Sequence, residues 1–313
     1  MKLLAFAPRP VREGLPGGPP RIGFATPGGI GDLTSLGIRD LGALVAAWPA
    51  RRRELEAALG NPRMALVDPD TVSLRAPLPR PGKIVCIGLN YHDHCREQGI
   101  EPPAYPRLFA KFANAVTDPG TPVVRPAATE KLDLECELGV VIGREASHVA
   151  RDAAMDAVFG YTIVNDVTMR DLQAEDRQWL RAKGSDGFAP MGPAVVTRDE
   201  IPNPQALRLR SSVNGETWQD STTGEMVFDV PTLVAFVSRF IRLEPGDVIS
   251  TGTPAGVGHY QRPPRYLAEG DLMRCEIEGI GVIENPVIDE TPRIAEHAVA
   301  AGIEVRAEAG ATR

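Results

Sequence analysis

The 313-residue sequence predicts an α+β protein that is mostly β. It contains 31 glycines and 29 prolines but few long amphipathic stretches, which is typical of many short strands joined by turns. The pattern also changes near residue 80, where strand-like segments begin to dominate. We therefore expect a small N-terminal α+β domain over residues 1–80, a β-rich domain over residues 81–290 and a C-terminal tail over residues 291–313.

The N-terminal domain should begin with a short strand over residues 1–8, followed by a Gly/Pro-rich stretch over residues 14–31. Apolar residues at helical spacing, with a charged run after them, predict one or two helices within residues 41–56. Three prolines in residues 77–81 cannot continue a helix or a central strand, so a linker is expected over residues 77–82.

The second domain should contain recurring strands and few helices. Apolar runs and alternating patterns predict strands over residues 83–88, 140–142, 160–164, 194–196, 207–213, 248–251 and 272–282. Helical spacing predicts helices over residues 153–158, 169–179 and 231–240. The alanine-rich tail beyond Pro292 is expected to form a loose helix or to be disordered.

Composition excludes several function classes. The net charge is −7 and basic residues are scattered, which argues against nucleic acid and against a polybasic membrane patch. The first apolar run is too short for a signal peptide, and no run approaches the length of a membrane span, so a cytoplasmic protein is expected. The four cysteines form no C-x-x-C pair, which indicates neither a zinc knuckle nor a disulfide framework.

Alternating acids are the most informative feature of the second domain. Asp133, Glu135 and Glu137 alternate with apolar residues from Leu132 to Leu138, which predicts a half-buried strand with three carboxylates on one face. Such a row can simply face solvent. If it lies near a core, mutual repulsion favours a bound hard cation that takes oxygen ligands.

A further acid, Asp166, follows a β-rich run about thirty residues later, at a predicted strand end. On its own it is better explained as a helix N-cap. Together, Glu135, Glu137 and Asp166 make an all-oxygen set without histidine or cysteine, which suits Mg²⁺ or Mn²⁺ completed by waters, or Ca²⁺. Zinc would favour nitrogen or sulfur ligands.

A polar segment after residue 88 carries two histidines. If it is helical, His94 and Glu97 share a face, so the carboxylate can orient the imidazole and raise its basicity for activating water. His92 and His94 could instead chelate a metal, or the helix face could simply be solvated.

Two glycine-punctuated segments are candidate ligand loops. Residues 181–190 carry Lys183, and residues 250–258 carry Thr253, whose hydroxyl and neighbouring amides could bind an oxyanion or a carboxylate. Neither segment contains a Walker A or a dinucleotide-binding glycine motif. Each is also unexceptional as a structural turn.

Taken in order, these segments resemble the fumarylacetoacetate hydrolase (FAH) family from roughly Lys83 to Val287. The motifs that carry the resemblance are GLNYHDHCRE, LFAKF, LDLECELGVVIG, GYTIVNDVTMRDLQ, AKGSDGFAPMGP, VNGE and STGTPAGVG. The resemblance implies a catalytic domain of mixed β-sandwich-roll type, usually a homodimer. It also implies a Mg²⁺ or Mn²⁺ site and substrates that are 2-oxo acids or 1,3-diketones.

The resemblance also implies roles for individual residues. Metal carboxylates match Glu135, Glu137 and Asp166. The His–Glu dyad of the acylpyruvate-hydrolase and oxaloacetate-decarboxylase branch, usually on a lid, matches His94 and Glu97. The active-site lysine matches Lys183, and the positions associated with substrate match Lys111, Arg170, Gln173 and Thr253. Asp133 is not assigned to the metal, and we expect it to be a supporting or merely solvated neighbour.

The presence of the dyad favours C–C bond cleavage. We therefore expect a metal-dependent hydrolase acting on an acylpyruvate or related β-diketo acid, such as fumarylpyruvate or acetylpyruvate, through a metal-bound enolate. The alternatives are an oxaloacetate decarboxylase and a 2-hydroxyhepta-2,4-diene-1,7-dioate isomerase of aromatic catabolism. A non-catalytic binder of small molecules is a third possibility, although no predicted metal or dyad position is lost.

Overall fold

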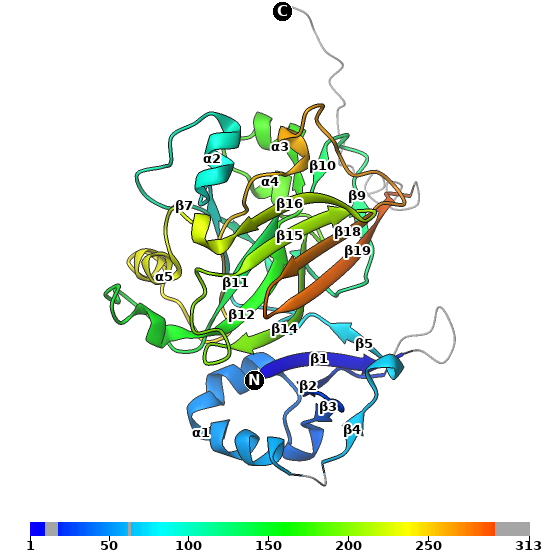
Figure 1. Ribbon diagram of the computed structural model, residues 1–313, viewed down its shortest axis with the longest axis vertical. Helices are drawn as coiled ribbons and strands as arrows, with labels where there is room; N and C mark the ends of the chain where they lie inside the picture. Colours follow the sequence, from blue (N-terminus) through cyan, green and yellow to red (C-terminus); the bar gives the residue numbers. More distant parts are fainter. Residues whose placement is uncertain (10–17, 62–63, 292–313) are drawn as a thin grey trace, which may run out of the picture.

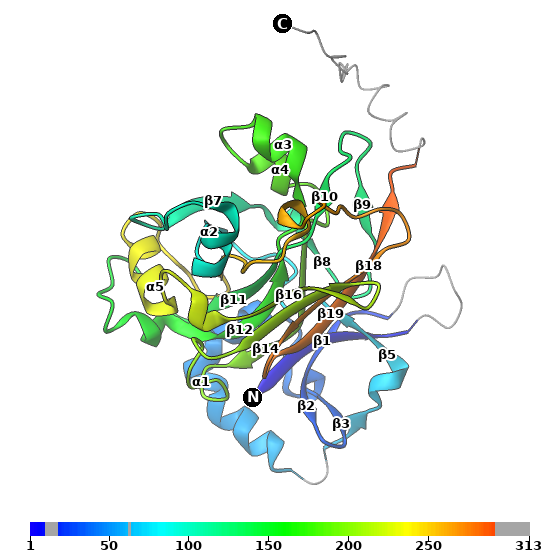
Figure 2. The ribbon, with the colours of Figure 1, turned by 45° about the horizontal axis from the view of Figure 1, so that its top comes forward.

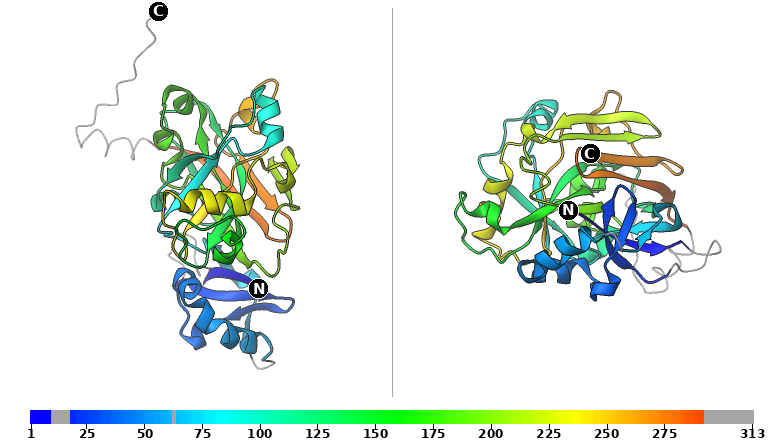
Figure 3. Two further views of the ribbon diagram at one scale, coloured as in Figure 1. Left: turned by 90° about the vertical axis from the view of Figure 1, so that its left-hand side faces the viewer. Right: turned by 60° about the horizontal axis from the view of Figure 1, so that its bottom comes forward.

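The structure, a computed structural model, describes residues 1–9, 18–61 and 64–291, so the predicted C-terminal tail beyond Pro292 lies outside the described residues. Strands dominate these ranges and helices are short (Figure 1), which confirms the mostly β, α+β prediction. The N-terminal segment lies at one end of the molecule, below the larger part (Figure 3). No helix within the described ranges has the length and hydropathy to cross a bilayer.

The N-terminal segment is a small sheet with one long helix. Its strands are β1 Lys2–Pro8, β2 Arg21–Thr26, β3 Gly29–Asp32, β4 Leu66–Val67 and β5 Val72–Arg75, and its helix is α1 Leu41–Leu59. The Gly/Pro-rich stretch thus contains the hairpin β2–β3, where Gly29 adopts a positive φ of 137°. The Asp40 carboxylate caps α1 by accepting from the Ala43 N–H at 2.6 Å.

The large sheet of the described residues holds twelve strands in the order β4-β3-β2-β1-β14-β12-β11-β17-β6-β7, with β5 beside β1 and β8 beside β14. Its further strands are β6 Ile84–Gly88, β7 Arg107–Lys111, β8 Val116–Thr117, β11 Cys136–Ile142, β12 Val158–Asn165, β14 Ala189–Thr197 and β17 Val248–Ser250. Because β1 pairs with β14, the N-terminal segment and the larger part share one sheet. The domain boundary near residue 80 stays a prediction.

A second sheet packs on the large one (Figure 1). Its order is β16-β15-β18-β19-β9, with β9 Val123–Arg125, β15 Arg208–Val213, β16 Glu216–Thr222, β18 Leu272–Ile277 and β19 Gly281–Asp289. A short ladder joins β10 Leu132–Asp133 to β13 Thr168–Met169. The remaining α-helices of the described residues are α2 His92–Gln98, α3 Arg170–Glu175, α4 Leu180–Lys183 and α5 Val230–Ser238. Helices α2, α3 and α4 lie toward the end of the molecule opposite the N-terminal segment (Figure 1), and α3 and α4 stand at the top of the turned view (Figure 2).

Strand β11 is buried on both faces, so the prediction of one half-buried acidic strand is wrong. Leu138 and Val140 pack into the core between the two sheets, whereas Val141 packs into the core under the N-terminal segment. The ladder is also broken between Asp133 and Cys136, because β10 pairs with β13 while β11 pairs with β12. The three acids therefore do not form one exposed row.

Three other element predictions need correction. Residues 153–158 form a 3₁₀ turn, Ala154–Ala157, that leads directly into β12. The helix expected over residues 169–179 ends at Glu175, and α4 follows as a separate turn that ends at Lys183, so this lysine closes a helix instead of lying in a loop. The strand expected over residues 272–282 is the hairpin β18–β19.

Candidate active site

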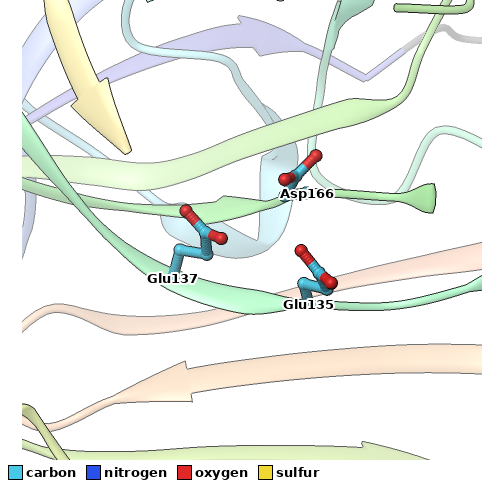
Figure 4. A group of neighbouring side chains, drawn as sticks. All are labelled: Glu135, Glu137 and Asp166. Carbon is cyan, nitrogen blue, oxygen red and sulfur yellow. The ribbon is translucent and has the colours of Figure 1, made fainter. Parts of the chain in front are cut away.

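Three buried carboxylates converge at the ends of β11 and β12. Glu135 precedes β11, Glu137 lies on it, and Asp166 follows β12. The antiparallel register pairs Cys136 with Asn165, and the Asp166 N–H donates to the Glu135 carbonyl at 2.8 Å, which places their side chains together. One carboxylate oxygen of each residue lies within 4.8 Å of the others, and Figure 4 shows the three carboxylates facing a common space.

Two of these carboxylates have cationic partners. Lys183 Nζ lies 2.8 Å from Glu135 Oε2 and 2.6 Å from Asp166 Oδ2. Arg170 Nη1 lies 2.7 Å from Glu135 Oε1, and Lys111 Nζ lies 2.7 Å from Asp166 Oδ1. Burial alone would raise the pKa of Glu135, but Lys183 and Arg170 outweigh it and hold that pKa far below its usual value. Glu135 is therefore ionised at neutral pH.

Glu137 has no cationic partner among the described residues. Its Oε2 accepts from the Ser250 hydroxyl at 2.6 Å and from the Gly252 N–H at 3.0 Å. Burial, together with the nearby charges of Asp166 and Glu135, raises the pKa of this carboxyl well above its usual value. A divalent cation held by Glu137, Glu135 and Asp166 would supply the missing positive charge, and three oxygen donors fit Mg²⁺ or Mn²⁺. The donor set therefore fits the predicted metal.

The predicted dyad is formed on α2. His94 Nδ1 lies 2.9 Å from Glu97 Oε2, and both side chains are largely buried. Glu97 Oε1 accepts from the Gly256 N–H at 2.8 Å, which ties α2 to the loop after β17. The other ring nitrogen, Nε2, lies 2.8 Å from Gln98 Nε2. His92 is exposed, so it does not join His94 in a chelating pair.

A cavity of about 330 Å³ extends from His94 to Glu135 and Glu137, whereas Glu97 and Asp166 do not line it. Its lining includes seven of the predicted site residues, namely His94, Glu135, Glu137, Arg170, Gln173, Lys183 and Thr253. Gln173 Oε1 accepts from Arg170 Nη1 at 3.0 Å, and Arg170 Nη2 is buried without a hydrogen-bond partner. Because a buried N–H donor normally has an acceptor, Arg170 has bonding capacity left for a bound anion.

Two predicted substrate contacts already bond to protein groups through their polar atoms. Lys111 does not line the cavity, because its ammonium is enclosed by Asp166 and by the carbonyls of Val167, Lys183 and Phe188. It therefore supports Asp166 and has no open N–H in this arrangement. The Thr253 hydroxyl donates to the Cys136 carbonyl at 3.0 Å and accepts from Gln219 Nε2 at 2.7 Å.

Asp133 is wholly buried and contacts Arg170, so of its two expected roles the structure shows the supporting neighbour and not the solvated one. Several other residues of the site were not predicted. The cavity wall also contains Gln98, Arg107, His259 and Tyr260. Gln98 was accessible to sequence reasoning, since it lies four residues after His94 on the same helix face. No motif marks His259 and Tyr260, which lie after β17 and are far from α2 in the sequence.

The sequence profile described as "Fumarylacetoacetate (FAA) hydrolase C-terminal" matches residues 83–288. The chain belongs to the fumarylacetoacetate hydrolase family. The match begins just before β6 and ends within β19, so it contains the carboxylate cluster and the dyad. Other members of this family are enzymes, including proteins named as hydrolases, tautomerases and isomerases.

Individual relatives cover most of the chain. The protein named oxaloacetate tautomerase fahd2, mitochondrial, of Xenopus laevis is 42% identical over 281 residues, or 86% of each chain. A putative HpcE protein from Mycobacterium smegmatis superposes with a TM-score of 0.81 at 34% identity, over 93% of this chain and 100% of that one. Maleylpyruvate hydrolase from Sphingobium sp. SYK-6, solved with manganese(II) and pyruvate, gives 0.77 at 31% identity with the same coverage. These likenesses, with the carboxylate cluster, support a divalent-metal site in this family member.

Proposed function

We propose that the protein is a divalent-metal-dependent hydrolase that cleaves the C–C bond of an acylpyruvate or related β-diketo acid. One observation carries the proposal. His94, oriented by Glu97, lines the same cavity as Glu135, Glu137 and Lys183. A base, an acidic metal site and a buried cation thus surround one space, which is the combination that enolate-forming chemistry requires.

The residues divide the reaction between them. Mg²⁺ or Mn²⁺ held by Glu135, Glu137 and Asp166 would polarise the keto group of a 2-oxo acid as a Lewis acid. His94 would take a proton from a water molecule, whose oxygen adds to the second carbonyl carbon, and Glu97 would stabilise the imidazolium. The C–C bond then breaks, its electron pair enters the pyruvate part as an enolate, and the Lys183 ammonium stabilises the oxygen that gains charge. The proton that His94 took from the water then passes to the enolate carbon, which gives pyruvate and a second acid and restores the neutral imidazole.

Product analysis tests this reaction. Acetylpyruvate and fumarylpyruvate, each with Mg²⁺ or Mn²⁺, should give pyruvate and a second acid in proton NMR spectra. His94→Asn should abolish this turnover, because general bases typically contribute 10²- to 10⁴-fold. Turnover at the wild-type rate in His94→Asn would overturn the mechanism. A protein that converts no 2-oxo acid under these conditions would instead be a non-catalytic binder.

A second candidate is isomerisation or decarboxylation of oxaloacetate. It is favoured by the relatives named oxaloacetate tautomerase, which are 40–46% identical to this chain. In the isomerisation, His94 would take a proton from the carbon next to the keto group and the keto oxygen would gain one to give the enol, with no water added and no bond between carbons broken. NMR separates the outcomes, because isomerisation conserves mass, decarboxylation releases CO₂, and hydrolysis gives two acids.

We also propose a homodimer in the cytoplasm. An exposed apolar patch on and beside β7 consists of Tyr105, Leu108 and Phe112. A second copy of the chain that covers this patch would form the dimer in solution. Light scattering after gel filtration should give twice the monomer mass of 33.6 kDa. Cell fractionation tests the location, for which the mitochondrial relatives offer the competing outcome.

A further inference from the structure

Strand β7 presents three residues to the site at a spacing of two. Lys111, at the inner end, contacts Asp166, and Phe109 follows with its ring 5.0 Å from Lys183 Nζ. Arg107, at the outer end, lines the cavity. Alternation along a strand puts these side chains on the side opposite Leu108, and Arg107 is exposed at the outer end of the strand. Four residues of strand span about 13 Å, so Arg107 lies at the far end of the cavity from the carboxylates.

Within the described residues, the guanidinium of Arg107 has no ion-pair partner. The other two cations of the cavity wall are paired, since Arg170 contacts Asp133 and Glu135, and Lys183 contacts Glu135. Across the described ranges, no carboxylate lies within ion-pair distance of Arg107. Unpaired arginines are common on outward surfaces, but this one occupies the side of β7 that forms a wall of the cavity.

The charge balance of the site shows what Arg107 adds. The buried charges at the carboxylate end, within the described residues, are four carboxylates, Asp133, Glu135, Glu137 and Asp166, and three cations, Lys111, Arg170 and Lys183. One divalent ion and one substrate carboxylate bring this set to neutrality. The guanidinium of Arg107 then remains as a positive charge at the mouth, and a second carboxylate on the same ligand would neutralise it.

We propose that Arg107 binds the distal carboxylate of a 2-oxo dicarboxylic acid and so selects dicarboxylates over monocarboxylates of the same length. The assignment rests on the proposed function, which places a 2-oxo acid at the carboxylate end. Phe109 and Trp179, whose rings lie 5.3 Å apart beside the path to the mouth, border the carbon chain of such a ligand. Arg107 is thus a specificity-determining residue and takes no part in bond breaking.

The test uses two ligands that differ only at the far end. 2-Oxoglutarate and 2-oxopentanoate have the same chain length, and only the first has a second carboxylate. Titration calorimetry with Mg²⁺ should show tighter binding of 2-oxoglutarate to the wild type. Arg107→Gln should weaken 2-oxoglutarate roughly ten- to hundredfold and leave 2-oxopentanoate unchanged, since a hydrogen bond to a charged group typically contributes that much. Arg107→Lys should restore part of the affinity.

Arg242→Gln is the matched control, because it removes an exposed arginine that pairs with Glu145 away from the cavity. It should bind both ligands as the wild type does. Equal weakening of both ligands by Arg107→Gln, or no weakening of 2-oxoglutarate, would overturn the assignment of Arg107 alone. Failure of the wild type to bind either ligand would remove the proposed function, and this assignment with it.

Discussion

Asp133 Oδ2 lies 2.9 Å from Arg170 Nε, and both side chains are buried. The same carboxylate accepts from the N–H groups of Gly258 and His259 at 2.9 and 3.0 Å. Asp133 therefore joins three segments that are far apart in the sequence: the end of β10, the start of α3 and the loop that carries His259 into the cavity wall. Through Arg170 it also fixes one oxygen of Glu135.

Asp133→Asn should destabilise the protein strongly. The change leaves the Arg170 guanidinium buried with one partner fewer, and breaking a buried pair typically costs about 3–5 kcal/mol. Urea unfolding measures the loss. Asp220→Asn is the control, because Asp220 pairs with Arg208 at the surface, where such pairs contribute about 0–1 kcal/mol. Equal losses in the two variants would show that the buried contact has no special importance.

Divalent cations should raise the melting temperature of the wild type through Glu137. A ligand that binds only the native state stabilises it, by about 2.7 kcal/mol at a hundredfold excess over its Kd. Glu137→Gln keeps the shape of the side chain but removes the charge, so it should lose most of this increase with Mg²⁺ or Mn²⁺. Glu145→Gln, an exposed change, should keep it. An undiminished increase in Glu137→Gln would place the cation elsewhere.

Loss of the dyad should separate turnover from metal binding. Glu97→Gln removes the charge that orients His94, and we expect kcat to fall roughly a hundredfold or more. The thermal shift with Mg²⁺ should persist, because Glu97 is not part of the carboxylate cluster. His92→Asn serves as the control, since His92 is an exposed neighbour on the same helix. If His92→Asn lowered kcat as far as Glu97→Gln did, the assignment of the base would be wrong.

Lys183→Met should lower the stability of the metal-free protein and increase the thermal stabilisation that a divalent cation gives. Without metal, Glu135 and Asp166 lose a shared cation, so the free energy of unfolding should fall by about 3–5 kcal/mol. A divalent ion would replace that charge, and the thermal shift with Mg²⁺ should exceed that of the wild type while turnover is lost. A smaller shift than in the wild type would show that Lys183 helps to hold the cation.

Much of the site could be predicted because its residues lie in short local patterns. Glu135 and Glu137 are two apart, and His94 and Glu97 are one helical turn apart, so spacing alone brought each pair together. The contacts of Asp133 with Gly258 and His259 were not predictable, because those two residues lie about 125 positions away in the sequence. The burial of β11 on both faces was also not predicted, because the N-terminal segment that covers one face is distant in sequence and carries no family motif.

The contact of the N-terminal segment with the large sheet limits how the chain can be shortened. Leu3 and Ile22 share a core with Val141, Val164 and Val195, on the central strands that also position the carboxylates. A chain that began at residue 81 would expose the apolar side chains of this core to solvent and would leave part of β14 without its neighbour β1. Exposed strand edges beside apolar surface promote aggregation. The segment without a motif is therefore part of the layer that supports the carboxylates, and its removal should yield an insoluble product.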